Sequence, residues 1–194
     1  MAKMHLRCVL SAATCSHFSR LKKKTIRRVG ATRLPFTTMN IGYLQTPMGA
    51  FKIASDGAKL KYIKLLKEDE KMDENADFAV EKAKLQLAEY LSGQRKNFDL
   101  PLDLQQGTEF QQKVWKAPQN IPYGQTRSYG TIAREVGSPR GARAVGNAVH
   151  NNPFLIVVPC HRVINGDGTI GGFGEGIMVK RNLFAVEDIT ELCK

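Results

Sequence analysis

The stretch FLIVVPCHR, residues 154–162, joins an unbroken apolar run to a cysteine and a histidine. A short run of this kind predicts a buried strand over 154–158, which would end at Pro159 and place the sulfur of Cys160 at the rim of a cleft. A free thiol, with a pKa of about 8.5, is only a few per cent ionised at neutral pH, and a neighbouring imidazole such as that of His161 can raise this fraction. The stretch therefore predicts a nucleophile with a base beside it.

Length and composition limit the possible classes of protein. The chain has 194 residues, of which 42% are hydrophobic, enough for one or two small domains. No apolar run approaches the ~20 residues that a membrane-spanning helix needs, so we expect no membrane partner. The four cysteines show no disulfide-framework spacing, which favours a reducing compartment. Cys8 and Cys15 lie near His5 and His17, but this spacing fits no compact zinc pattern, and no metal site is predicted.

Basic charge is concentrated at the N-terminus. Residues 1–39 hold nine Lys and Arg and no acid, whereas residues 40–194 hold 20 basic and 18 acidic residues, so the net charge of +11 says little about the folded part. The composition of residues 1–39, the basic leader, is typical of a mitochondrial transit segment. The basic run at 21–28 equally suits nuclear import. In a third reading Met39 is the true start, which in a prokaryote would make the protein cytoplasmic; otherwise we expect the mitochondrion or the nucleus.

Residues 40–104 predict a small α+β unit. We expect strands over 41–45, 50–55 and 60–66, with turns at Thr46-Pro47-Met48-Gly49 and Asp56-Gly57. A helix follows over 75–92, where apolar residues recur at helical spacing and Gly93 is placed to end it. Residues 97–106, which include Pro101, read as a linker.

A helix opens the second unit, residues 108–194. The residues from Thr108 to Gln111 have capping-box form, which marks a helix start. We expect this helix to bury Phe110 and Val114. Pro118 then ends it, because proline cannot continue the backbone hydrogen bonds of a helix.

Two further short helices follow. One over 128–136 is closed by Gly137, and Ser138 is expected to cap another that runs to about 150. Two short helices joined by a Gly-Ser turn predict a helix-turn-helix, although many helical hairpins bind nothing. The second helix is rich in small residues, so it can approach a groove closely, and it carries Arg140 and Arg143.

Positive charge also gathers in this unit. Between residues 110 and 166 the one acid is Glu135, against seven basic residues: Lys113, Lys116, Arg127, Arg134, Arg140, Arg143 and Arg162. Such a surface can meet phosphates. Ordinary solvated charge is the alternative, and charge alone does not decide between them.

Several motifs occur in an ordered set: Ser128-Tyr129, Ala142-Arg143-Ala144-Val145-Gly146, Asn151-Asn152-Pro153, Pro159-Cys160-His161-Arg162-Val163, Gly171-Gly172-Phe173 and the closing segment from Lys180 to Glu187. In these motifs the chain resembles the O6-alkylguanine-DNA alkyltransferases, densely over 108–190 and weakly over 40–104. The resemblance implies an α+β fold, in which a small N-terminal antiparallel sheet plus helix, ribonuclease-H-like, precedes a mostly helical winged helix-turn-helix domain. The expected domains are a basic leader over 1–39, the N-terminal domain over 40–104 and the DNA-binding alkyltransferase domain over 108–194.

The resemblance also implies a reaction. Such a protein moves a methyl or other alkyl group from O6 of guanine, and by extension from O4 of thymine, irreversibly to its own cysteine, so that each molecule acts once. The expected partner is double-stranded DNA with an alkylated guanine, bound by a monomer without a cofactor. Family knowledge places the recognition helix in the minor groove, where a helix of small residues fits a widened groove. Because the target atom lies inside the base stack, the nucleotide must be flipped out.

Five catalytic residues follow from the resemblance. Cys160 accepts the alkyl group, His161 acts as base through a bound water, and Glu187 orients this histidine. Tyr129 donates its phenolic proton to the guanine ring, and Asn152 braces the active-site turn. Read from the residues alone, Glu187 is a surface carboxylate and Tyr129 a core aromatic.

The remaining site residues form two sets. DNA contacts are expected from Tyr129, Gly130, Ser138, Arg140, Arg143 and Gly166, with Arg143 filling the space of the flipped base or clamping a phosphate. The substrate pocket is expected at Pro159, Val163, Phe173, Gly174 and Lys180. Within it, the backbone carbonyls of Cys160 and Val163 would accept from the guanine amino group.

The chain departs from the family pattern at three places. Pro118-Gln119 replaces two apolar residues, so the helix before it should end early. Phe173 stands where tyrosine is common, which removes a hydroxyl from the pocket wall. Gly174-Glu175 replaces a small pair, and the bulk and charge of Glu175 at the pocket rim predict poorer acceptance of large O6 groups such as benzyl.

Two other classes of protein compete with this interpretation. A non-catalytic module that binds alkylated DNA would explain the helix-turn-helix, but it would not need Cys160. A cysteine hydrolase would use Cys160 and His161, but it would leave the helix-turn-helix and Tyr129 without a role.

Overall fold

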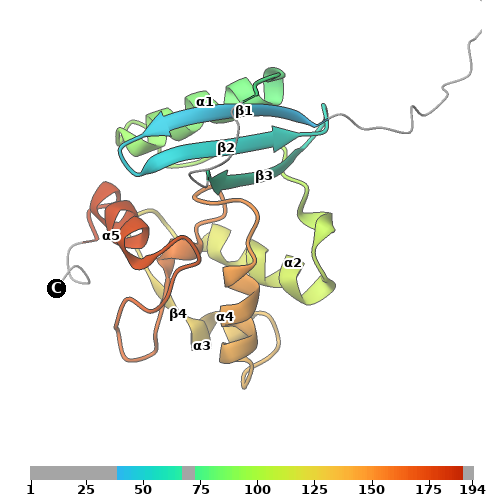
Figure 1. The fold of residues 1–194 in the computed structure, drawn as a ribbon. Coiled ribbons are helices and arrows are strands. Elements are labelled where there is room, and N and C mark those ends of the chain that lie inside the picture. The colour runs from blue at the N-terminus through green and yellow to red at the C-terminus, as the bar shows by residue number, and fades with distance from the viewer. Residues whose placement is uncertain (1–38, 67–72, 190–194) are drawn as a thin grey trace, which may run out of the picture. The chain divides into compact units, whose positions relative to one another are not determined.

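The computed structural model describes residues 39–66 and 73–189 of the chain. Figure 1 shows a three-stranded sheet with one long helix, followed by a largely helical half. The strands and α-helices are β1 (Asn40–Thr46), β2 (Gly49–Ser55), β3 (Leu60–Leu65), α1 (Phe78–Leu91), α2 (Glu109–Lys116), β4 (Arg127–Ser128), α3 (Tyr129–Glu135), α4 (Ala142–His150), β5 (Val163–Ile164) and α5 (Ile177–Val186). Three 3-10 turns lie at Leu104–Gln106, Ala117–Asn120 and Cys160–Arg162. No helix among these described residues is long and apolar enough to cross a membrane.

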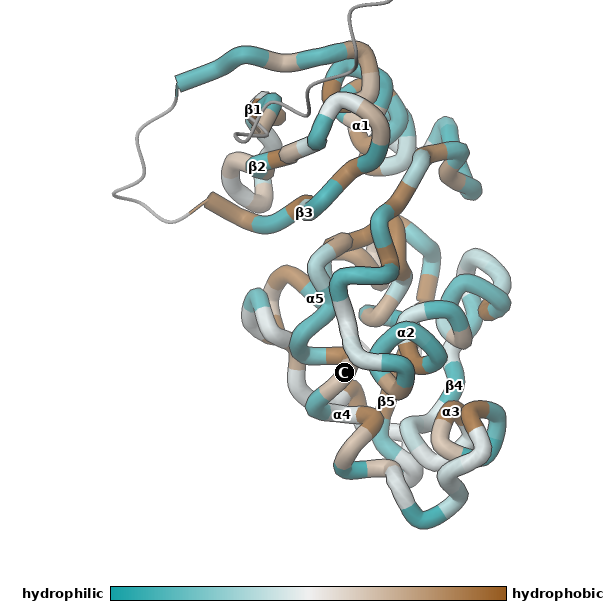
Figure 2. Tube along the Cα trace, turned by 90° about the vertical axis from the view of Figure 1, so that its right-hand side faces the viewer, coloured by the Kyte–Doolittle hydropathy of each residue, from teal (hydrophilic) through white to brown (hydrophobic). Residues whose placement is uncertain are grey.

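The sheet has the order β1-β2-β3, with both pairs antiparallel. Hydrophobic and hydrophilic residues are interspersed along β3 in Figure 2, and Phe51 and Ile53, two residues apart in β2, are fully buried, as expected of a sheet with one face on a core. Helix α1 covers this face. It starts three residues later than the predicted 75 because the carboxylate of Asp77 accepts from Val80 N at 2.9 Å and caps the helix there. The three predicted strands are confirmed within one residue at each end.

The outer edge of β3 is occupied rather than open. The predicted linker over 97–106 pairs with it: Leu60 N donates to Pro101 O at 2.8 Å, and Asp103 N donates to Leu60 O at 3.0 Å. Further along, Ile63 exchanges hydrogen bonds with Pro153 O at 2.8 Å and Leu155 N at 3.0 Å. These bonds tie the sheet to the helical half, and one hydrophobic cluster contains residues of both.

Helix α2 begins and ends as the sequence predicts. Thr108 and Gln111 form the full capping box. The α-helix ends at Lys116, and Pro118 lies in the 3-10 turn that follows. Val114 is buried, whereas Phe110 is half-buried at the margin of the core. The indole Nε1 of Trp115 donates to Ala148 O at 2.8 Å, which fixes α2 against α4.

The helix-turn-helix is formed by α3 and α4, but the second helix begins later than expected. Gly137, at φ 79°, closes α3 as predicted. The prediction that Ser138 caps α4 is wrong: Ser138 O accepts from Gly141 N at 2.7 Å, so residues 138–141 close a turn of their own. The N-cap of α4 is Gly141, without a side-chain cap. Arg140 therefore lies in the turn before the helix, and Arg143 lies in its first turn.

The predicted strand over 154–158 is also wrong. Phe154 makes an isolated bridge to Ile63, after which the chain turns, with Val158 N donating to Phe154 O at 3.0 Å. Ile156 has the left-handed φ of 71°. All five residues are buried because the turn lies inside the core. An unbroken apolar run shows burial on all sides, and it cannot distinguish a buried turn from a strand.

Candidate active site

The buried turn carries Cys160 at its end, and the side chain of Asn152 holds it in shape. Asn152 Oδ1 accepts from Phe154 N at 2.9 Å. Its Nδ2 donates to Phe154 O at 3.2 Å and to Val158 O at 3.1 Å. One amide thus satisfies backbone groups at both ends of the turn. These bonds fit the bracing role expected of Asn152.

The sulfur of Cys160 is more enclosed than expected. The residue is 3% exposed, so the thiol does not lie at an open rim. Burial raises the pKa of Cys160 to about 12, although a hydrogen bond to Asn152 and the positive charge of Lys180 act in the opposite direction. In the free protein the neighbouring imidazole therefore does not ionise this sulfur, and the resting group is the neutral thiol.

Glu187 lies at the centre of a buried network and is 1% exposed, not a surface carboxylate. Arg162 donates from Nε to both carboxylate oxygens at 3.0 Å and from Nη2 to Oε1 at 2.8 Å. Gly124 N donates to Oε2 at 3.0 Å, and the hydroxyl of Tyr90 donates to Oε1. Burial alone would raise the pKa of Glu187, but hydrogen bonds from His161 and Arg162 outweigh it and lower the pKa to about 2. The carboxylate is ionised at neutral pH.

This carboxylate determines which nitrogen of His161 carries the proton. Nε2 lies 2.8 Å from Glu187 Oε1, so we assign the proton to Nε2, where it is donated to the carboxylate. Burial lowers the pKa of His161, so the ring is neutral. Nδ1 is buried and has no hydrogen-bond partner within the part of the chain that the structure describes. His161 therefore presents an unprotonated nitrogen next to Cys160 in sequence, as a base requires.

Lys180 and Tyr129 secure the loop between β5 and α5. The fully buried Lys180 donates from Nζ to Val163 O at 2.7 Å, Ile170 O at 2.6 Å and Gly172 O at 3.4 Å. Burial lowers the pKa of Lys180 to about 8. The hydroxyl of Tyr129 lies 3.5 Å from Gly172 O, and burial raises the pKa of Tyr129, which keeps the phenol protonated. Of the two carbonyls expected to accept from guanine, that of Val163 already accepts from Lys180.

The other predicted site residues fall into two groups by exposure. Arg140, Arg143, Gly166 and Gly174 are exposed, and Gly166 and Gly174 lie in the loop between β5 and α5. Gly130, Ser138 and Phe173 are half-buried, while Pro159 and Val163 are buried beside Cys160. On α4, Ala142 and Ala144 share the exposed surface with Arg143, so that face is formed by small side chains.

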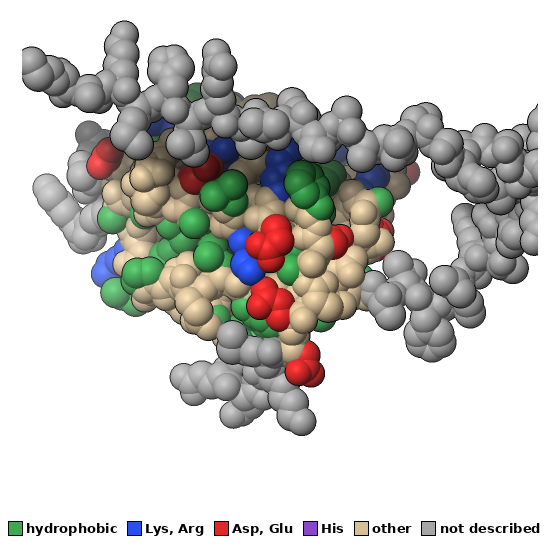
Figure 3. All heavy atoms as spheres, turned by 90° about the horizontal axis from the view of Figure 1, so that it is seen from above, with side chains coloured by type: hydrophobic (Ala, Val, Ile, Leu, Met, Phe, Trp, Pro, Cys, Tyr) green, Lys and Arg blue, Asp and Glu red, His purple; other side chains and the backbone are tan. Residues whose placement is uncertain are grey.

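The exposed basic surface contains fewer residues than the seven predicted from the sequence. Arg162 is 7% exposed and bound to Glu187, so it does not belong to the surface. Arg127 forms an ion pair with Glu135. The exposed members that remain are Lys113, Lys116, Arg134, Arg140 and Arg143. In Figure 3, by contrast, the coloured part of the upper face mixes acidic, basic and apolar side chains.

Sequence reasoning missed two members of the site. Arg162 directly follows Cys160 and His161, and its position in the motif was the available signal, but it was counted as surface charge. Tyr90 lies in α1, and no local motif in the sequence connects it with the active site. No group of three or more metal-ligating side chains that could hold a metal ion occurs within 39–66 and 73–189. His5, Cys8, Cys15, His17 and the basic run at 21–28 lie outside the described residues.

Comparison with known proteins agrees with this arrangement. Residues 39–104 match the family model for the ribonuclease-like domain of 6-O-methylguanine DNA methyltransferase, and residues 109–189 match the model for its DNA binding domain. The chain belongs to the 6-O-methylguanine DNA methyltransferase family. The family and the α+β fold class expected from the sequence are thereby confirmed.

Individual relatives support the same assignment. A methylated-DNA--protein-cysteine methyltransferase of Methanosarcina acetivorans is 41% identical over 155 residues, which are 77% of this chain and 98% of the relative. One of Mycolicibacterium paratuberculosis is 54% identical over 102 residues, 53% of this chain and 61% of the relative. The crystal structure of the Mycobacterium tuberculosis O6-methylguanine methyltransferase covers 77% of this chain and 93% of that chain at 41% identity, with a TM-score of 0.69. A structure of the Mycobacterium tuberculosis protein in complex with DNA covers 76% and 92% at 43% identity, also with a TM-score of 0.69.

Proposed function

We propose that this protein repairs DNA by transferring an alkyl group from O6 of guanine to Sγ of Cys160. The observation that carries the proposal is the state of His161. Its Nε2 is held by an ionised carboxylate, and its Nδ1 is a buried acceptor without a partner among the described residues. That arrangement is a base prepared for the thiol of Cys160, which does not ionise by itself.

The transfer balances as follows. The bond between Sγ and the alkyl carbon forms while the bond from that carbon to O6 breaks. The thiol proton passes to Nδ1 of His161, directly or through one water, and Glu187 stabilises the imidazolium. Negative charge develops on the guanine ring, and the protonated hydroxyl of Tyr129 supplies the proton that neutralises it. His161 then gives its proton to solvent and Tyr129 regains one, so the products are guanine and a thioether on Cys160, with both side chains back in their starting forms.

We infer that each molecule acts once. Water does not displace a thiolate from a thioether, and nothing in the proposed set of residues removes the alkyl carbon from sulfur. O4-alkylated thymine presents the same bond, an alkyl carbon on an exocyclic oxygen, and is proposed as a second substrate. All the proposed catalytic residues belong to one chain, which supports action as a monomer. A DNA-containing compartment remains our proposal for where the protein acts.

Double-stranded DNA is the proposed partner, held by α3, α4 and the loop around Gly166. The exposed Arg140 and Arg143 lie beside the small residues of α4 and leave room for close approach to a groove. Because the sulfur is enclosed, we propose that the alkylated base leaves the stack and enters the site. The structure of the Mycobacterium tuberculosis relative in complex with DNA supports this partner.

Intact mass spectrometry tests the proposal. The purified protein is mixed with an equimolar duplex that contains O6-methylguanine, and the same duplex without the methyl group serves as the control. We expect a gain of one methylene per molecule on the peptide of Cys160, no gain in Cys160→Ala, and no further reaction when fresh substrate is added. Binding without any mass gain would favour the non-catalytic module. Many lesions processed per molecule would contradict the single-use reaction.

A further inference from the structure

Tyr90 reaches the active site from the N-terminal half of the chain. It lies near the end of α1 and is fully buried. Its hydroxyl donates to Oε1 of Glu187 and lies 3.3 Å from Nε2 of His161. The ring is fixed by its neighbours, with its centroid 5.2 Å from that of Phe98 and 6.1 Å from that of Tyr123. These ring contacts therefore hold the hydroxyl of Tyr90 against one carboxylate oxygen of Glu187.

The hydroxyl acts as a donor at every relevant pH. Burial, followed by the charge of Glu187, raises the pKa of Tyr90 well above its usual value. Three residues, Tyr90, His161 and Arg162, thus donate to Oε1, while Arg162 and Gly124 N donate to Oε2. Because both oxygens accept hydrogen bonds from several directions, the carboxylate has little freedom to rotate. The direction of its hydrogen bond from Nε2 of His161 is therefore fixed.

The charged groups that face His161 come from several elements. Glu187 favours the protonated ring, whereas Arg162 and Lys180 oppose it, and desolvation opposes it most. The neutral hydroxyl of Tyr90 shares the negative charge of Oε1 with the Nε2 proton. Without that hydroxyl, Oε1 attracts the Nε2 proton more strongly, so the pKa of His161 rises and the ring is protonated at a higher pH.

We propose that Tyr90 is a positioning residue for alkyl transfer, whose hydroxyl fixes Oε1 of Glu187 and thereby the orientation and basicity of His161. The inference rests on the proposed function, because it concerns the same base. It assigns part of the active-site network to α1, outside the domain that carries the nucleophile.

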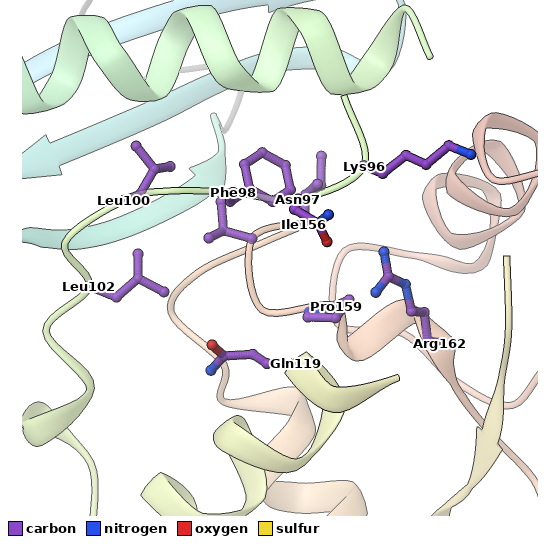
Figure 4. A pocket seen from close by; sticks show the side chains of 10 residues that line it. Lys96, Asn97, Phe98, Leu100, Leu102, Gln119, Ile156, Pro159 and Arg162 are labelled. Atoms are coloured by element: carbon purple, nitrogen blue, oxygen red, sulfur yellow. The ribbon is translucent and has the colours of Figure 1, made fainter. Parts of the chain in front are cut away.

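The surroundings of the turn support this assignment. Figure 4 shows Lys96, Phe98 and Leu100, from the segment after α1, across a hollow of about 150 Å³ from Pro159 and Arg162. Phe98, which packs on Tyr90, thus lines the same hollow as the residues on either side of Cys160 and His161. The segment that supports Tyr90 and the turn that carries the nucleophile are adjacent, so a displacement of one reaches the other.

The test compares Tyr90→Phe with Tyr123→Phe. Both variants keep a ring in the aromatic cluster and lose a hydroxyl, but the hydroxyl of Tyr123 donates to Val186 O and does not contact the carboxylate of Glu187. Single-turnover methyl transfer from O6-methylguanine duplex is measured between pH 5 and 9. For Tyr90→Phe we expect transfer about tenfold slower at the plateau, a part of the roughly 10²–10⁴-fold that a positioned base contributes. We also expect its acid limb at a higher pH than in the unaltered protein. Tyr123→Phe should keep the unaltered pH profile.

A second measurement does not depend on activity. Nitrogen-15 NMR of the histidine rings in the unaltered protein should show His161 with its proton on Nε2, and a proton on Nδ1 would overturn the proposal. In folded Tyr90→Phe the same spectra should show a raised pKa of His161. An unchanged rate and pH profile in Tyr90→Phe, while the unaltered protein transfers methyl, would overturn the inference alone. Absence of transfer by the unaltered protein would instead overturn the proposed function.

Discussion

The side-chain amide of Asn152 donates to the carbonyl oxygen of Val158, 3.1 Å away and six residues further along the chain. With its bonds to Phe154, the same amide closes the turn that ends at Cys160. Ile156, inside this turn, keeps a left-handed φ of 71°, a conformation that β-branched residues rarely adopt. The position of Cys160 thus depends on one side chain that offsets local backbone strain.

Replacing Asn152 by alanine tests that dependence. The change removes three hydrogen bonds to backbone groups of a buried turn, so we expect the free energy of unfolding to fall by about 2–4 kcal/mol and methyl transfer to be lost. Denaturant unfolding and single-turnover transfer measure the two effects. The matched control is Asn151→Ala, which is exposed and bonds within its own helix end to Asn147 O. If Asn152→Ala behaved like this control, the turn would be held by other contacts.

The enclosed thiol predicts a clear pH dependence. With a pKa of about 12, Cys160 is far less ionised at pH 8 than an ordinary cysteine, so its reaction with iodoacetamide should be roughly a thousandfold slower than in urea-unfolded protein. The native state also keeps a proton that the unfolded chain loses above about pH 8.5, so this group lowers stability as pH rises from there towards 12. Peptide mapping by mass spectrometry measures labelling of Cys160. Equal labelling of folded and unfolded protein would contradict the raised pKa.

Arg143 is expected to act on base flipping more than on affinity for the duplex. It is exposed in the first turn of α4, where no ion pair in the described structure restrains it. Arg143→Ala should slow transfer from a paired O6-methylguanine by about tenfold, and slow it less when the lesion is mismatched, because unstacking then costs less. Arg140→Ala, which removes an equally exposed charge from the preceding turn, is the control. An equal decrease on both substrates would assign Arg143 to a phosphate instead.

Glu175 is expected to limit the size of the alkyl group. It is exposed next to Gly174, and both line a hollow of about 740 Å³ whose lining includes Asn152, which braces the turn of Cys160, but not Cys160 itself. Glu175→Gly removes bulk and charge from this rim, so the ratio of benzyl to methyl transfer should rise by about tenfold. Asp167→Gly, at an exposed position of the same loop that does not line the hollow, should leave the ratio unchanged. A ratio that does not move in Glu175→Gly would refute the size limit.

Local signals in the sequence predicted the secondary structure correctly where it is set by interactions between side chains and backbone groups a few residues apart. The capping box at Thr108, the end of α2 before Pro118 and the alternating strands of the sheet are all of this kind. The start of α4 and the buried turn at 154–158 were mispredicted, since both depend on contacts that local pattern does not contain. A turn surrounded by core on every side has the same apolar composition as a buried strand.

The sequence by itself determined the family and the fold class, and it predicted Cys160 and His161 as nucleophile and base, because these follow from an ordered set of motifs and short-range patterns. Tertiary structure alone decided the electrostatic state of the site. It buried the thiol, paired Arg162 with Glu187 and brought Tyr90 to the same carboxylate from 97 residues away in the chain. Protonation depends on desolvation and on charges within a few ångströms, and these are properties of packing that residue order does not state.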